Sequence, residues 1–254
     1  MELLSNAFAA LELDAEAAAE EEDDQVNATA SSAMSAQNTE PGKSEKTIDN
    51  SGVAAKSKKK NGQDLLTTSG EYKMPLVWID MEMTGLNIEV DRILEIACII
   101  TDGKLTKSVE GPDLVIHQSK ECLDRMGEWC QSHHATSGLT NKVLQSTISE
   151  REAETQVTEF VKRHIGTYTP LLAGNSVYMD FLFLKKYMPD LASIFSHVLV
   201  DVSSVKALCV RWYPRDQKKA PVKENKHRAM DDIKESIVEL KYYKESIFKA
   251  KPKT

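Results

Sequence analysis

The chain has 254 residues, of which 41% are hydrophobic and 28% charged, and a formal net charge of −7 at pH 7. This length and composition allow one large or two small domains with a buried core, and they exclude a chain that is disordered throughout. No stretch approaches the ~18–20 continuous apolar residues that span a bilayer, and the start lacks the basic and apolar segments of a signal peptide, so we expect a soluble protein that is not secreted.

Two features of the sequence bear on its cellular location. The four cysteines form no CxxC pair and no cluster with histidine at zinc spacing, so free thiols in a reducing compartment are expected and a structural zinc site is not. Residues 1–24 contain nine acidic residues and no basic one, which argues against a mitochondrial presequence. We expect a cytoplasmic protein. The lysine run at 56–60 is either a nuclear address or a solvated linker, and a nuclear or mitochondrial pool stays open.

The negative charge lies in the first part of the chain. Residues 1–73 hold 14 acidic and 7 basic side chains, which leaves 25 of each sign in residues 74–254. Phe8 is the only aromatic residue before Tyr72. Such a segment buries too little apolar surface to offset its ordering entropy, so we expect a disordered acidic tail over 1–73 and a folded domain over 74–254. Leucines at near-helical spacing around Phe8 leave a short partner-binding helix open within the tail.

From Pro75 onward the pattern is typical of a folded domain. The β-branched and apolar runs LVWID at 76–80 and ILEIACIITD at 93–102 predict two strands, separated by turn-like residues. The run LVIHQ at 114–118 predicts a third. Because the connections are too short for a helical crossover, the three strands are expected to form an antiparallel meander.

Helices then alternate with strands. Apolar residues at helical spacing predict helices at 150–164, 178–188, 203–212 and about 227–248. Short apolar runs predict strands at 170–176 and 198–202. This order indicates an α/β domain, in which a mixed sheet carries helices on its faces.

Two carboxylates stand near the end of the first predicted strand. In WIDME, Asp80 and Glu82 are two residues apart, so both side chains point from the same face of a strand. Together they offer half of the oxygen ligands of a site for a hard metal ion. A lone pair of this kind is more often an ordinary polar strand end, so further residues must decide between the two interpretations.

Further acidic residues occur at two later positions. Asp180 lies in the first turn of a predicted helix, directly after a predicted strand, and is either a site residue or an acid favoured by the helix dipole. In HRAMDD, His227 precedes Asp231 and Asp232 at the start of the last predicted helix. Alone, this segment is also compatible with a charged turn that faces solvent.

Taken in order, the segments WIDMEMTGL, GNSVYMDFLFLKKYMP and HRAMDDIKES resemble the three exonuclease motifs of the DEDDh nucleases, and specifically those of the oligoribonuclease family. The resemblance covers about residues 75–248 and includes the intervening RILEIA, GPDLVIHQS, SGL and LVDVSSVK. It implies a ribonuclease-H-like fold with a central mixed sheet flanked by helices. It also implies a 3'-to-5' exoribonuclease that acts on very short RNA and releases nucleoside 5'-monophosphates.

The resemblance assigns the catalytic site to five residues: Asp80, Glu82, Asp180, His227 and Asp232. Asp231 is the alternative for the last acid, because a spacing of four from the histidine would place it on the same helix face. The family spacing is histidine, four residues, then aspartate, which favours Asp232.

The family chemistry explains why these residue types are needed. The four acids are expected to hold two Mg²⁺ or Mn²⁺ ions ~3.5–4 Å apart, which clamp the attacking and leaving oxygens of a phosphodiester. Asp80 is expected to bridge both ions. His227, with an ordinary imidazole pKa of ~6.5, is expected to act as the general base at neutral pH.

Further matches place residues beside the substrate. Leu86 and Trp129 match an apolar wedge and an aromatic platform for the bases, although Trp129 is equally compatible with a half-buried core residue. His134, Ser176 and Ser203 match polar residues near the substrate of the family.

The sequence departs from the family pattern at His197 and Val198. Many members have tyrosine and arginine there, which help to bind the terminal phosphate from the dimer partner. The resemblance therefore implies a homodimer in which His197 lies near the neighbouring site.

Two other functions remain open. One is a DEDDh exonuclease that trims longer RNA or DNA ends, which the dependence of activity on substrate length would distinguish. The other is a non-catalytic RNA-binding adaptor that kept the fold, which a manganese-dependent hydrolysis assay would distinguish. All five expected site residues are present, which favours an enzyme.

Overall fold

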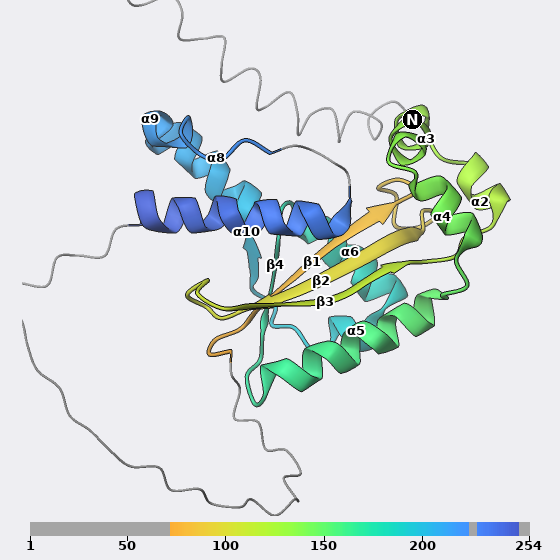
Figure 1. Ribbon diagram of the computed structural model, residues 1–254, viewed down its shortest axis with the longest axis horizontal. Coiled ribbons are helices and arrows are strands. Elements are labelled where there is room, and N and C mark those ends of the chain that lie inside the picture. Colours follow the sequence, from red (N-terminus) through yellow and green to blue (C-terminus); the bar gives the residue numbers. More distant parts are fainter. Residues whose placement is uncertain (1–71, 224–227, 249–254) are drawn as a thin grey trace, which may run out of the picture.

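The computed structural model describes residues 72–223 and 228–248. Nearly all of the expected tail, and also His227, lie outside the described residues. Within them, five strands form one mixed sheet in the order β3-β2-β1-β4-β5 (Figure 1). The strands are β1 Leu76–Met83, β2 Ile93–Thr101, β3 Ser108–Val115, β4 Leu171–Gly174 and β5 Leu199–Asp201. This is the mixed α/β sheet that the sequence predicts.

The strand pairing explains where the ends of the strands meet. β1 pairs antiparallel with β2, and β2 antiparallel with β3, which confirms the expected meander. β4 is parallel to both β1 and β5. The carboxyl ends of β1, β4 and β5 therefore lie at the same edge of the sheet, where sites of α/β domains are usually found.

The third strand was expected at 114–118, which is wrong: β3 spans Ser108–Val115. Gly111 and Pro112 in its middle hide the strand pattern, but an edge strand with an irregular register tolerates proline. The glycine has a packing role, because a Cβ at Gly111 would lie 2.3 Å from the ring of Phe160. Gly111 thus lets a helix pack closely against the edge of the sheet.

Alternate residues of β1 contribute to two separate cores. One face, with Val77, Ile79 and Met81, packs against α5 (Glu150–Ile165). The other face, with Leu76 and Trp78, packs against α10 (Ala229–Ser246). Figure 1 shows these two helices on opposite sides of the sheet. Because Asp80 and Glu82 continue the series of Leu76 and Trp78, they face the side that α10 covers.

Seven further helices complete the described part of the chain. Three short helices pack around Leu94 and were not located from the sequence. They are α2 Lys120–Asp124, α3 Glu128–Thr136 and α4 Leu139–Gln145. The other four follow β4 or β5: α6 Tyr178–Tyr187, α7 Pro189–Ala192, α8 Val202–Trp212 and α9 Pro214–Gln217. Of these, α6 and α7 pack in the core with α5, and α8 packs in the core with α10.

Three further observations concern the domain boundary, the cysteines and membrane-spanning helices, for which the composition gave expectations. Tyr72 is buried in the main core, two residues before the expected domain boundary at 74, so the folded part includes it. The four cysteines are free thiols, as expected, and the structure buries all four. Among the described residues, no helix is long and apolar enough to cross a membrane.

Candidate active site

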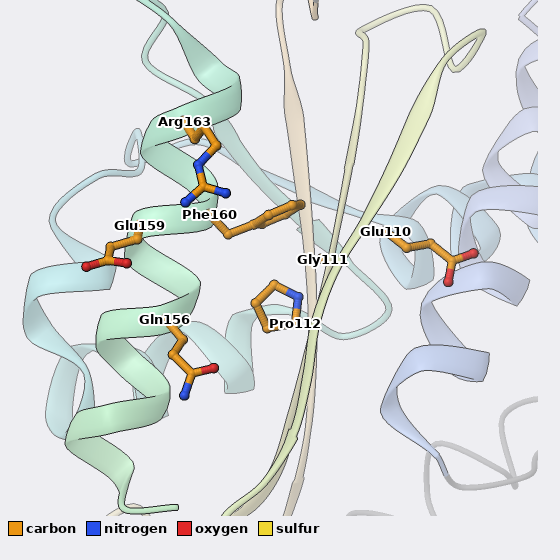
Figure 2. A pocket seen from close by; sticks show the side chains of 7 residues that line it. All are labelled: Glu110, Gly111, Pro112, Gln156, Glu159, Phe160 and Arg163. Atoms are coloured by element: carbon orange, nitrogen blue, oxygen red, sulfur yellow. The ribbon is translucent and has the colours of Figure 1, made fainter.

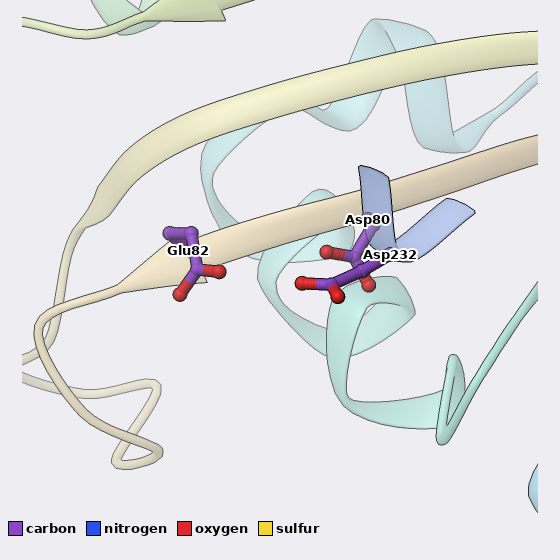
Figure 3. Close-up of side chains that lie close together, drawn as sticks. All are labelled: Asp80, Glu82 and Asp232. Carbon is purple, nitrogen blue, oxygen red and sulfur yellow. The ribbon is translucent and has the colours of Figure 1, made fainter. Parts of the chain in front are cut away.

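Three carboxylates meet at the carboxyl end of β1. Asp80 and Glu82 project from the face expected from their spacing, and Asp232 joins them from the first turn of α10 (Figure 3). One carboxylate oxygen from each residue lies within 4.8 Å of the others. Carboxylate oxygens at this separation match the ligands that hard divalent cations prefer. The three residues therefore form a candidate site for a divalent metal ion.

The helix start explains why Asp232 takes this place. The backbone N–H groups of Asp231 and Asp232 both donate to the carbonyl of Arg228, at 2.9 and 3.0 Å, which closes the first turn of α10. Of the two acids considered for the last position, Asp232 belongs to the carboxylate cluster that the structure forms.

Asp180 lies beside this cluster. It is buried in the first turn of α6, where its own backbone and that of Met81 lower the pKa of its carboxyl against the larger effect of burial. Its charge raises the pKa of Asp80 after the larger effect of burial, so the two side chains are close neighbours. It does not belong to the group of three whose oxygens lie within 4.8 Å.

The electrostatics of the site are those of crowded acids. Burial, followed by repulsion from Asp180, Glu82 and Asp232, raises the pKa of Asp80 well above its ordinary value. Burial, and then repulsion from Asp232, raises the pKa of Glu82 to about 8. Burial also raises the pKa of Asp180 to about 8 and that of Asp232 to about 6. A divalent cation would remove this repulsion, so the residues present fit a metal.

The expected general base lies outside the described residues. The structure describes Lys223 and Arg228, which flank the segment 224–227, but not His227. Lys223 pairs with the buried Glu239 at 3.1 Å and donates to Ser236 at 3.2 Å. Its charge also lowers the pKa of Asp80 and Asp232, against the larger effect of burial.

His134 lies behind Glu82. It comes from α3 and is only 1% exposed. Its Nε2 donates to the carbonyl of Met83 at 2.9 Å, and its Nδ1 lies 3.9 Å from Glu82 Oε2. The structure therefore places this residue, expected near the substrate, in contact with a candidate metal ligand.

Ser176 and Ser203, both assigned to the substrate side from the sequence, lie in contact with each other. Their hydroxyl oxygens are 3.0 Å apart, and the Ser203 hydroxyl donates to Asn175 Oδ1 at 2.8 Å. The Ser176 N–H donates to Asp201 at 3.0 Å and holds the turn between β4 and α6, where Ser176 has a φ of 52°.

The two residues expected to contact bases are partly buried. Leu86 packs against the main core from the loop after β1. Trp129 packs on the cluster of short helices and stacks on the ring of His133, with 3.8 Å between ring centroids. The proposed contacts of both residues with bases remain proposals. Trp129 also has the half-buried core position that the sequence left open.

His197 is not brought to the carboxylates within one chain. It is exposed and directly precedes Val198 and β5, at the amino end of the parallel strands. The carboxylates lie at the opposite, carboxyl end of β1. A role for His197 at a catalytic site therefore requires a second copy of the chain.

Glu95, Asp201 and Lys223 were given no individual role from the sequence. Glu95 is a lone acid in an otherwise apolar strand, a signal that could have identified it. Asp201 also ends a short apolar run, whereas Lys223 is one of several lysines in a polar loop and carries no distinguishing signal.

One hollow in the described structure lies away from these residues. It has a volume of about 370 Å³ between β3 and α5 and is lined by residues including Pro112, Phe160 and Arg163 (Figure 2). Since α5 covers the face of the sheet opposite to Asp80, this hollow is not part of the carboxylate site.

Known structures share this fold. A solved structure of exonuclease I matches with a TM-score of 0.54 at 15% sequence identity, over 68% of this chain and 41% of that one. At this identity the likeness shows the fold alone, and this chain spans about two fifths of that protein. A family model described as exonuclease, RNase T, matches residues 77–240 and gives the class of the protein.

Relatives of similar sequence identify the family of the protein within this class. Oligoribonuclease from Arabidopsis thaliana is 73% identical over 182 residues, which cover 72% of this chain and 82% of that protein. The mitochondrial oligoribonuclease of Homo sapiens is 50% identical over 176 residues, or 69% and 74% of the two chains. The chain therefore belongs to the oligoribonuclease family of RNase T exonucleases, which confirms the resemblance found in the sequence.

Proposed function

We propose that the protein is a 3'-to-5' exoribonuclease that hydrolyses very short RNAs to nucleoside 5'-monophosphates with the help of divalent metal ions. The observation that carries this proposal is the carboxylate cluster of Asp80, Glu82 and Asp232 at the end of β1. The names of the relatives support the substrate class.

Two Mg²⁺ or Mn²⁺ ions are the proposed cofactors. Asp80, Glu82, Asp180 and Asp232 are the residues that would hold them, because all four carry oxygen donors and three already lie within 4.8 Å of one another. When bound, the ions stabilise the charge that develops on the attacking and leaving oxygens.

The protein side chains have distinct roles in this proposal. The carboxylates would hold the metal ions, the counter-ions of the reacting phosphate, at the carboxyl end of β1. His227 is proposed to accept the proton of the attacking water, which a group with an ordinary pKa of ~6.5 does efficiently at neutral pH. Asp231 is assigned no role, because it lies outside the cluster.

The charge of the folded part supports a short substrate. Residues 74–254 carry 25 basic and 25 acidic side chains, so no net positive charge is available to follow a long strand. Leu86 and Trp129 are proposed to contact the bases, and His134, Ser176 and Ser203 to lie at the polar side of the substrate. A small number of such contacts suits RNAs of about two to five nucleotides.

A homodimer is part of the proposal. His197 lies at the amino end of the parallel strands, so it reaches a carboxylate site only from a partner subunit. Exposed apolar side chains near the end of α8, Leu208, Trp212 and Tyr213, support the presence of a protein interface. We propose the cytoplasm as the location; the name of the human relative keeps a mitochondrial pool open.

The dependence of kcat/KM on RNA length tests this function. RNAs of about two to twenty nucleotides with a 5'-phosphate would be compared, with Asp80→Asn as a control for contaminating nucleases. We expect the highest kcat/KM at about two to five nucleotides, and a salt dependence of about 1–2 in log-log slope, since few phosphates are held. A kcat/KM that rises steadily with length would instead indicate a general exonuclease, and equal activity of the control would refute catalysis at this site.

A further inference from the structure

Glu95 is a charged residue within an apolar strand. It lies in β2, is fully buried, and stands directly opposite Glu82 in the antiparallel ladder between β1 and β2. Burying a carboxylate is strongly unfavourable unless hydrogen-bond and charge partners are present. The partners of Glu95 therefore indicate what it does.

These partners all belong to the start of α10. Nε of Arg228 donates to both carboxylate oxygens of Glu95 at 3.1 Å, and Nη2 donates to Oε1 at 2.5 Å. The backbone N–H of Ala229 donates to Oε2 at 3.3 Å. The guanidinium fork and the first helical N–H thus hold the two oxygens of one buried carboxylate.

The contacts continue from Arg228 to the carboxylate cluster. Arg228 is the N-cap residue of α10, and its carbonyl accepts the backbone hydrogen bond of Asp232 at 3.0 Å. Asp232 in turn places a carboxylate oxygen within 4.8 Å of those of Asp80 and Glu82. Glu95, Arg228 and Asp232 form an unbroken series of contacts from the sheet to the site.

We propose that Glu95 and Arg228 are a positioning pair, which fixes the first turn of α10 against β2 and thereby sets the separation of Asp232 from Asp80 and Glu82. This role rests on the metal-dependent function proposed above. Neither residue touches the substrate in this proposal; both act through the placement of Asp232.

Physical reasons favour this role over a contribution to stability alone. Two of the elements that supply candidate ligands, β1 and α10, are more than a hundred residues apart in sequence, so their relative position depends on noncovalent contacts. A buried ion pair is a poor source of stability, but a bidentate arginine fixes the orientation of both partners. Partners of metal-binding side chains typically change metal affinity or activity 10–100-fold when they are altered.

A purely electrostatic effect of Glu95 and Arg228 on cation binding predicts a different result from a positioning role. Removing the negative charge of Glu95 beside the site should weaken cation binding, whereas removing the positive charge of Arg228 should strengthen it. If the pair acts by positioning, both changes loosen the first turn of α10 and both weaken cation binding. The sign of the effect at Arg228 therefore separates the two explanations.

The experiment measures Mn²⁺ binding by calorimetry and steady-state kinetics on a dinucleotide for Glu95→Gln, Arg228→Gln and Arg228→Lys. Glu154→Gln is the matched control. Glu154 is also buried, on the opposite face of the sheet; it accepts from Arg151 at 3.1 Å and from the backbone N–H of Asp190, at the start of α7, at 2.7 Å. Melting temperatures of the metal-free proteins report the loss of stability in each variant.

We expect both glutamine variants to bind Mn²⁺ about tenfold or more weakly and to lose kcat with little change in KM. Arg228→Lys, which keeps the charge without the fork, should recover less than half of the lost kcat. The control should lose melting temperature but bind Mn²⁺ within about twofold of the unaltered protein.

Three results would overturn the inference: tighter Mn²⁺ binding by Arg228→Gln, unchanged binding in both glutamine variants, or an equal loss of affinity in the control. If Glu95→Gln does not fold, the comparison of Arg228→Gln with Arg228→Lys decides in the same way. Failure of the unaltered protein to bind Mn²⁺ would contradict the proposed metal site itself, which is a different outcome from normal binding that the variants leave unchanged.

Discussion

Asp80, Glu82 and Asp232 bring negative charge together in a partly buried place, where burial first, and then repulsion from neighbouring acids, makes each carboxylate harder to ionise. The resulting rise in pKa is a consequence of a site built for a counter-ion. Such a site destabilises the metal-free protein at neutral pH, and this cost is common where catalytic groups are concentrated.

The first prediction separates neighbouring acids. Asp232→Asn should lower kcat/KM by at least ~100-fold, because a ligand charge worth several kcal/mol to the transition state is lost. Asp231→Asn, one residue away on the same helix turn, removes the same charge outside the cluster and should stay within about threefold of the unaltered enzyme. Kinetics on a dinucleotide check both variants. The opposite result, an inactive Asp231→Asn with an active Asp232→Asn, would show that the last acid is assigned wrongly.

The second prediction concerns pH. The pKa of Glu82 rises on folding from 4.5 to about 8, so the folded state holds its proton more tightly than the unfolded state. Stability from this source is complete below about pH 4 and is lost as the pH rises through 8. The melting temperature of the metal-free protein should therefore fall between pH 5 and 8, and Mg²⁺ should restore it at pH 8.

Glu82→Gln is the control for this effect. The variant lacks the titrating group, so its melting temperature should fall less over the same pH range and should exceed that of the unaltered metal-free protein at pH 8. Differential scanning calorimetry in the presence and absence of a chelator measures both. A steeper fall in Glu82→Gln than in the unaltered protein would refute the explanation.

Sequence reasoning succeeded at residues where spacing alone determines geometry. Asp80 and Glu82 share a face because strand side chains alternate, and this needs no tertiary information. Glu95 could not be given a role in the same way, since its partner Arg228 is 133 residues away and the pairing depends on how α10 crosses the sheet.

At the level of elements, too, local sequence patterns predict some features, whereas features that depend on tertiary packing leave no such pattern. The long helix α5 and the buried strands β1 and β2 have periodic apolar patterns and lie within a residue or a few of the expected bounds. β3 was placed wrongly because Gly111 and Pro112, which usually end strands, are accommodated there by the edge position and by the ring of Phe160. That accommodation is a property of the packed structure and leaves no local signal.

Asp201 connects two elements and gives a third prediction. Its carboxylate accepts from the N–H of Ser203, as the N-cap of α8, and from the N–H of Ser176 in the turn before α6. Asp201→Ala should lower the free energy of unfolding by about 1–3 kcal/mol, because it removes a cap and leaves a second donor unsatisfied. Asp201→Asn keeps one carbonyl oxygen and should lose less. Urea denaturation compares them; equal stability of all three proteins would contradict this role.

At the level of the whole molecule, the position of His197 links the fold to assembly. The strand order puts β5 at an edge of the sheet, with His197 at its amino end, and the carboxylates lie at the carboxyl end of the central β1. A single chain cannot bring these ends together without breaking the sheet. The sequence resemblance predicts a dimer. The fold explains why His197 could act at a carboxylate site only within a dimer, because it separates this residue from the carboxylates of its own chain.

The last prediction uses this geometry in a mixing experiment. His197→Ala and Asp80→Asn are each expected to form dimers by sedimentation and to lose most of their activity on dinucleotides. If His197 serves the partner's site, a mixed dimer contains one complete site, made of the acids of the His197→Ala chain and the histidine of the other. Since random exchange makes half of the dimers mixed, equimolar mixing should restore about a quarter of full activity. If His197 acted within its own chain, each mixed dimer would contain two defective sites, and mixing would restore nothing.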